Sequence, residues 1–102
     1  EATMFGPYFD QEEPQVPILG LVASEDQSPS YELDAAAVFK CKEGWLVVQV
    51  SGCSCWPDMG GTTQTHCPRK SDVDRALSGG KWADLITACQ TAKWKVTEKV
   101  PE

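Results

Sequence analysis

The side chains best able to do chemistry lie close together in the middle of the chain. Cys53 and Cys55 lie in the run Ser51–Pro57, and ten residues separate Cys55 from the pair His66-Cys67. Three of the five cysteines and the only histidine therefore fall within fifteen residues. Thiolate and imidazole groups bind soft metal ions, and thiolates are also nucleophiles. The cluster predicts a metal site or a thiol site.

Zinc is the metal that this set would suit. Cys53, Cys55, His66 and Cys67 offer three sulfur ligands and one nitrogen ligand, the number and chemistry of a tetrahedral zinc site. Their spacing is unusual, because a single residue separates Cys53 from Cys55 and the other two ligands are adjacent. Adjacent residues reach one ion only from a bent backbone. The hypothesis from these residues is a small structural zinc-binding domain.

Three other states of the same residues stay open. A disulfide from Cys67 to Cys53 or to Cys55 would close the loop in an oxidising compartment. Cys53 or Cys55 would be the nucleophile of a thiol-dependent enzyme with His66 as its base, although no signature places a carboxylate beside that histidine. Free thiols in a reducing compartment are the third state, and five cysteines cannot all pair within one chain.

Charge is distributed unevenly along the sequence. Residues 1–39 hold eight acidic side chains and no Lys or Arg, whereas residues 40–102 hold nine basic and seven acidic side chains. A nucleic-acid partner is not expected, since a basic surface should then dominate. No membrane partner is expected either, because the longest apolar run, Trp45 to Val50, is far shorter than a membrane span.

Periodicity predicts the regular elements. Alternating apolar residues indicate a hairpin of residues 33–41 with 45–51, whose second strand is apolar on both faces and therefore central. A helix is expected from the cap Ser71, with Asp74 in the capping box, to Gly79-Gly80. A second helix is expected over 81–91. Apolar residues at helical spacing predict a buried stripe on each helix: Val73, Ala76 and Leu77 on the first, and Trp82, Leu85, Ile86 and Cys89 on the second. A lysine-guarded edge strand is expected in the tail. Cys41 and Cys89 fall on apolar faces and are expected to be small buried hydrophobes.

These elements predict an α+β fold, a small antiparallel sheet of three to four strands with one or two helices packed on one face. The chain of 102 residues has room for one core. We assign residues 31–102 to this domain, with a Cys-rich loop at 52–70 that lacks regular structure. We assign residues 1–30 to an extended acidic Pro-rich arm, in which Ile18 to Val22 is either a strand or an anchor on the core.

The run from Tyr31 to Pro57 resembles small uncharacterised proteins of tailed bacteriophages, especially those of actinobacteria. Those proteins have an aromatic strand, a glycine turn, a second apolar strand and the motif Ser-Gly-Cys-Ser-Cys-Pro. The matching residues here are Tyr31, Val38, Phe39, Gly44, Ser51-Gly52-Cys53-Ser54-Cys55 and Pro57. Trp56 and the pair His66-Cys67 depart from the pattern. The resemblance implies a phage origin and a place in the host bacterial cytoplasm, and it implies no activity.

The function expected from these observations is that of a non-enzymatic phage accessory protein, such as an anti-defence or takeover factor, that binds and modulates a bacterial host protein. The acidic arm suits a basic partner surface. We assign Asp10, Glu12, Glu13 and Trp56 to partner binding, and Trp56 is also expected to pack its loop on the core.

The zinc hypothesis makes a prediction about the cysteines. If Cys53, Cys55, His66 and Cys67 share one ion, replacing any one of them by Ala should release the metal and loosen residues 52–70. Cys41→Ala and Cys89→Ala should instead each cost about 1 kcal/mol as core truncations and leave the metal content unchanged. Non-denaturing mass measurement with and without chelator reads both effects. Metal retained by Cys53→Ala would refute the zinc set.

Overall fold

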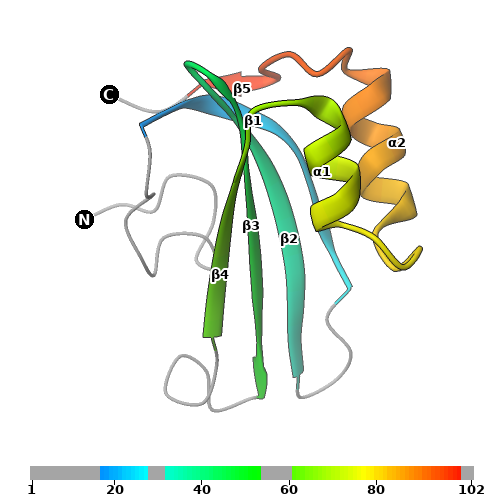
Figure 1. Ribbon diagram of the computed structural model, residues 1–102. Coiled ribbons are helices and arrows are strands. Elements are labelled where there is room, and N and C mark those ends of the chain that lie inside the picture. The colour runs from blue at the N-terminus through cyan, green and yellow to red at the C-terminus, as the bar shows by residue number, and fades with distance from the viewer. Residues whose placement is uncertain (1–16, 28–31, 54–60, 100–102) are drawn as a thin grey trace.

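The computed structural model describes residues 17–27, 32–53 and 61–99. Four long antiparallel strands form a sheet in the order β4-β3-β2-β1, and a two-residue strand, β5, lies beside β1. Two helices cover one face of this sheet (Figure 1). The elements are β1 (Ile18–Asp26), β2 (Glu32–Cys41), β3 (Gly44–Cys53), β4 (Gly61–Cys67), α1 (Lys70–Ala76), α2 (Ala83–Thr91) and β5 (Glu98–Lys99). The predicted α+β fold is confirmed.

The hairpin of β2 and β3 is the centre of the sheet. Its register pairs Cys41 with Gly44 at the turn and continues without a shift to Glu32 and Cys53 at the open end. Strand β3 lies between β2 and β4, as its two apolar faces predicted. The side chains of β3 alternate between two buried clusters. Trp45 and Val47 face the helices, and Leu46, Val48 and Val50 face the opposite side.

Strand β1 extends the sheet into the segment assigned to the arm. Residues 18–26 pair with β2 from Ile18↔Cys41 to Asp26↔Ala35, so the boundary that we placed after residue 30 does not separate arm from domain. Two register shifts interrupt this pairing, between Ile18 and Gly20 and between Leu21 and Ala23. Such bulges break the two-residue period. The apolar stretch therefore did not stand out as a full strand in the sequence, although a strand was one of its two predicted states.

Strand β4 corrects the prediction of an irregular loop at 52–70. Residues 61–67 pair with β3 from Ser51↔Gly61 to Trp45↔Cys67. The segment Gly-Thr-Thr-Gln-Thr-His-Cys has little apolar content, which concealed the strand. Its three threonines are β-branched and favour the extended backbone, and β3 provides the hydrogen-bonding partner. Regular structure in this segment is thus set by pairing more than by burial.

Both helices form in the predicted segments, but α2 begins at Ala83 and not at residue 81, and α1 begins before its predicted cap. Its first residue is Lys70, and the N-terminal carboxylate is Asp72, which accepts the Arg69 backbone N–H at 3.2 Å. The expected Ser71–Asp74 capping box is therefore wrong by two residues. The predicted stripes are confirmed at Val73, Leu77, Trp82, Leu85 and Cys89, which are buried. Ala76 and Ile86, the other predicted members, are only partly buried.

The tail departs from the alternating strand that its lysines suggested. Lys93 and Trp94 have φ angles of 58° and 59°, in the left-handed region that a strand excludes. This bend turns the Trp94 ring edge-on to Trp45, with 5.6 Å between ring centroids, and the Trp45 Nε1–H donates to the Trp94 carbonyl at 3.2 Å. Tertiary packing of the two indoles thus overrides the local period, and β-structure resumes only at Glu98–Lys99.

The turn between β2 and β3 depends on Gly44, and two glycine variants test this. Gly44 has a φ of 95°, and a Cβ there would overlap the Cys67 carbonyl oxygen and lie 2.6 Å from Pro68 Cα. Gly79 has the same φ of 95° but nothing within 4 Å of a Cβ. Gly79→Ala should cost about 1 kcal/mol of unfolding free energy for its backbone conformation alone. Gly44→Ala should cost about 3 kcal/mol or more, because steric overlap is added.

Urea unfolding of the two variants measures the difference directly. Because the two glycines have the same φ, the conformational cost of alanine is the same in both variants. The difference between their unfolding free energies therefore measures the steric overlap with the end of β4. Equal unfolding free energies for both variants would mean that β4 does not approach Gly44 this closely.

Candidate functional site

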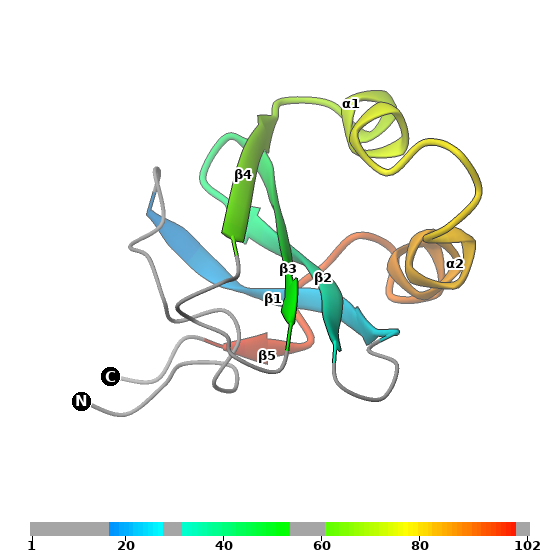
Figure 2. The same cartoon turned by 90° about the horizontal axis from the view of Figure 1, so that it is seen from below.

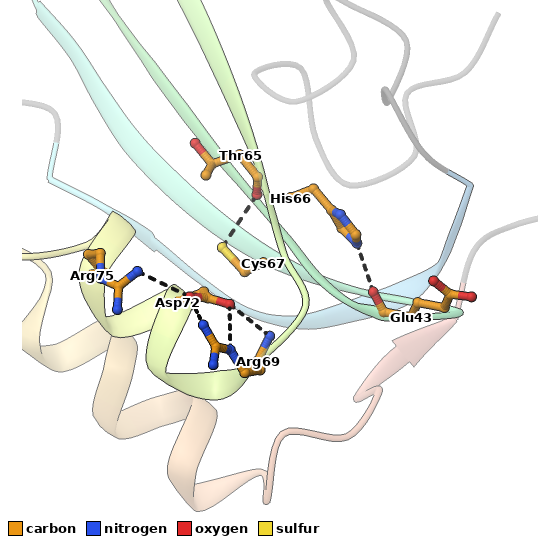
Figure 3. A network of polar contacts seen from close by, with 7 residues as sticks. All are labelled: Glu43, Thr65, His66, Cys67, Arg69, Asp72 and Arg75. Carbon is orange, nitrogen blue, oxygen red and sulfur yellow. Dashed lines mark hydrogen bonds and ion pairs between the residues drawn. The ribbon is translucent and has the colours of Figure 1, made fainter.

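His66 and Cys67, two of the predicted zinc ligands, lie on opposite faces of β4. Cys67 is opposite Trp45 in the register and lies in the cluster beneath the helices. His66 is opposite Leu46, which belongs to the other cluster. Figure 3 shows the two side chains pointing away from each other. Successive residues of a strand alternate between faces, and no bend of the kind that a shared ion would need occurs here.

His66 already uses one ring nitrogen. Its Nε2 lies 2.7 Å from the Glu43 carbonyl oxygen. A carbonyl oxygen only accepts, so Nε2 carries the proton and donates, and Nδ1 is the nitrogen left for a ligand or a base role. The ring borders a hollow of about 410 Å³ whose described lining is Pro17, Cys41, Lys42, Glu43 and His66.

The three described thiols are buried and free. Burial, with a smaller effect of Asp74, raises the pKa of Cys89 to about 11. Burial also raises the pKa of Cys67, and the nearby Asp72 and Cys41 raise it further. Burial raises the pKa of Cys41 as well, and the positive charge of Lys40 partly offsets that rise. A raised pKa leaves less thiolate, the form that attacks and binds metal. The prediction that Cys41 and Cys89 are small buried hydrophobes is confirmed by exposed fractions of 2% and 0%.

Cys53 lies at the other end of the sheet from Cys67. Cys67 is opposite Trp45, and Trp45 is eight residues before Cys53 on β3. Eight residues span roughly 26 Å of strand at about 3.3 Å per residue. A zinc–sulfur bond is about 2.3 Å and a disulfide needs Cα atoms within about 7 Å. The described backbone therefore brings neither Cys53 with Cys67 nor Cys53 with His66 together.

Cys55 lies outside the described residues, so zinc binding and the thiol-enzyme alternative stay predictions. The described backbone does not bring Cys53 to the same place as His66 and Cys67, as a zinc ion shared by all four residues would require. Within residues 17–27, 32–53 and 61–99, no three His, Cys, Asp or Glu side chains gather into a metal-binding group. The residues assigned to partner binding, Asp10, Glu12, Glu13 and Trp56, also lie outside the described residues.

A polar network at the start of α1 lies next to Cys67 (Figure 3). Asp72 accepts from Arg69 Nε at 3.3 Å and from Arg75 Nη1 at 3.4 Å. The hydrogen bond from the Arg69 side chain, and then its backbone N–H and the two positive charges, hold the pKa of Asp72 below its ordinary value. Burial opposes this shift only in part. The carboxylate stays ionised and positions both guanidinium groups.

This network borders the second hollow, which the sequence did not reveal. Its empty volume is about 670 Å³, and strand residues Thr65 and Cys67 lie across it from helix residues Asp72, Arg75 and Ala76. The helix residues stand at i, i+3 and i+4 and share one side of α1. That spacing was visible in the sequence. The strand that completes the hollow was not, because residues 61–67 were expected to be a loop.

Comparisons with protein-family models, with curated proteins and with solved structures found no match to this chain. Neither of the two described helices is long and apolar enough to span a membrane.

The buried thiol of Cys89 predicts how stability depends on pH. Its pKa is raised in the folded state, from an ordinary 9.0 to about 11. Below pH 9 the Cys89 thiol keeps its proton in both the folded and the unfolded chain, and its contribution to folding stability is fully present. Between pH 9 and about 11 the unfolded chain releases its proton while the folded chain does not, so stability falls as pH rises.

Thermal melts followed by circular dichroism from pH 8 to pH 10.5 measure this effect. The melting temperature should fall more steeply with pH for the natural chain than for Cys89→Ala. The variant has a constant offset from its lost volume, and that offset does not change with pH. Parallel curves for the two proteins would contradict the burial of this thiol.

Proposed function

We propose that this chain is a non-enzymatic accessory protein of a bacteriophage, which binds a host protein in the bacterial cytoplasm and changes that protein's activity. The likeness of residues 31–57 to phage proteins supports the origin and the compartment. The α+β domain serves as a scaffold that presents binding surfaces.

The separation of charge carries this proposal. Residues 1–39 have a net charge of −8, and residues 40–102 have a net charge of +2. Segment 1–16 alone contains Glu1, Asp10, Glu12 and Glu13 and no basic side chain. Acidic clusters of this kind raise the rate of encounter with a basic protein surface and determine which partners are rejected. The proposed surface includes Asp10, Glu12, Glu13 and Trp56.

Two features of the described residues bear on thiol catalysis by those residues, and the predicted nucleophiles Cys53 and Cys55 are not among the thiols concerned. The thiols of Cys41, Cys67 and Cys89 have raised pKa values, which lowers their reactivity. The only histidine donates from Nε2 to a backbone carbonyl, so that nitrogen does not serve as a base in this arrangement.

A charge-removal experiment tests the proposal. Crosslinking in host lysate followed by mass spectrometry identifies the partner, and the purified pair is then measured by surface plasmon resonance. Removing three charges in Asp10→Asn/Glu12→Gln/Glu13→Gln should slow association about tenfold at low salt, since steering scales with the charge. Added salt should narrow the difference by screening.

The matched control removes three acidic charges from the other part of the chain. Glu43, Asp84 and Glu98 are all exposed, and Glu43→Gln/Asp84→Asn/Glu98→Gln gives the same net charge. This control should bind nearly as fast as the natural chain. Equal slowing in both triple variants, or the recovery of no specific host protein, would overturn the proposal.

A further inference from the structure

The two edges of the sheet differ in how they are protected. Strand β5, at one edge, has two residues, Glu98 and Lys99, both charged. Strand β4, at the other edge, has seven residues with no acidic, lysine, arginine or proline residue. Short length, charge and proline are the devices that keep sheet edges from pairing with other chains. Strand β4 lacks them, and among the described strands it pairs with β3 alone.

Helix α1 stands beside this edge of the described sheet. In Figure 2 β4 is the last strand of the row, and α1 lies to one side of it. The hollow of about 670 Å³ lies between them, with Thr65 and Cys67 on the strand side. Asp72, Arg75 and Ala76 form the helix side. A strand edge next to a helix makes a groove in which an extended peptide can pair with the backbone and place alternate side chains toward the helix.

The charge of the groove indicates what its occupant carries. One carboxylate, Asp72, is shared by Arg69 and Arg75. The two arginine side chains are 73% and 76% exposed, and the Asp72 side chain is 16% exposed. The guanidinium groups therefore present surplus donors and positive charge to an incoming segment, and a guanidinium pairs best with a carboxylate. The matching occupant has an acidic side chain opposite Arg75.

We propose that β4 and α1 form a groove that binds an extended segment of a partner protein as an added sixth strand of the sheet, with an acidic side chain of that segment against Arg75. The inference rests on the proposed function for the role of that partner as a host protein. A second copy of this chain is a poorer occupant, because each copy has a net charge of −6 and the two repel.

The experiment uses displayed peptides, so that it does not depend on finding the host protein. Random linear 12-residue peptides are selected on the full chain, and the recovered peptides are synthesised and titrated by NMR. Amide shifts and intermolecular backbone contacts should follow β4 and the Asp72–Ala76 side of α1. The selected peptides should be enriched in Asp or Glu.

Variants separate backbone pairing from charge. N–H groups alternate in direction along a strand, so one of the backbone N–H groups of Gln64 and Thr65 donates to β3 and the other points away from β3. Of Gln64→Pro and Thr65→Pro, the variant that loses the N–H pointing away from β3 should keep the natural melting temperature and abolish peptide binding. Thr65→Val should keep both the melting temperature and peptide binding. Arg75→Gln should weaken binding about tenfold. Lys95→Gln removes the same charge from an exposed position between α2 and β5 and should change nothing.

Two outcomes overturn the inference. The first is the absence of any selected peptide that shifts β4, including peptides that bind only elsewhere on the chain. The second is protection of the β4 amides without peptide together with sedimentation as a dimer, which would assign the edge to a second copy. If both prolines unfold the chain, unchanged binding in Arg75→Gln has the same force. If a host protein binds through the acidic arm but no peptide binds at β4, the inference about the groove fails and the proposed function stands.

Discussion

Strand β3 has large apolar side chains on both faces, and the rest of the domain is arranged to keep both faces from water. On one side, Trp45 and Val47 lie beneath the helices with Val73, Leu77 and Leu85. On the other side, Leu46, Val48 and Val50 join Phe39 in the second cluster. Burial of apolar area contributes about 25 cal/mol per Å², so exposing either face would be costly for a domain of marginal stability. A strand of this kind needs neighbours on both edges, and β2 and β4 occupy those positions.

Alternation along a strand explains why the cluster of thiols and imidazole does not form a single site among the described residues. His66 and Cys67 are neighbours in sequence, yet β4 directs them to opposite faces. Cys67 contributes to the helix-covered core, where burial and Asp72 disfavour its thiolate. His66 closes the β2–β3 turn through the Glu43 carbonyl. Proximity in sequence was therefore a poor guide to proximity of reactive atoms, because regular backbone separates adjacent side chains.

The arrangement of polar groups favours recognition of another chain. The edge strand β4 has no acidic, lysine, arginine or proline residue, and Arg75, which pairs with Asp72, borders the hollow beside it. The acidic segment at the start of the sequence supplies charge of the opposite sign. Long-range attraction and a backbone-pairing edge act at different distances and can therefore contribute to one binding event without competing.

Residue patterns alone determined the β2–β3 hairpin, the central position of β3 and the buried stripes of both helices, because periods of two and 3.6 residues record which side chains must leave water. Tertiary structure alone decided the rest. Two bulges hid β1, and β4 became a strand because β3 offered an unsatisfied edge to a threonine-rich segment. The left-handed turn at Lys93 and Trp94 depends on packing against Trp45. Tertiary structure also decided the groove between β4 and α1. Its two sides come together only after β4 has paired with β3, and no local sequence period predicts that pairing.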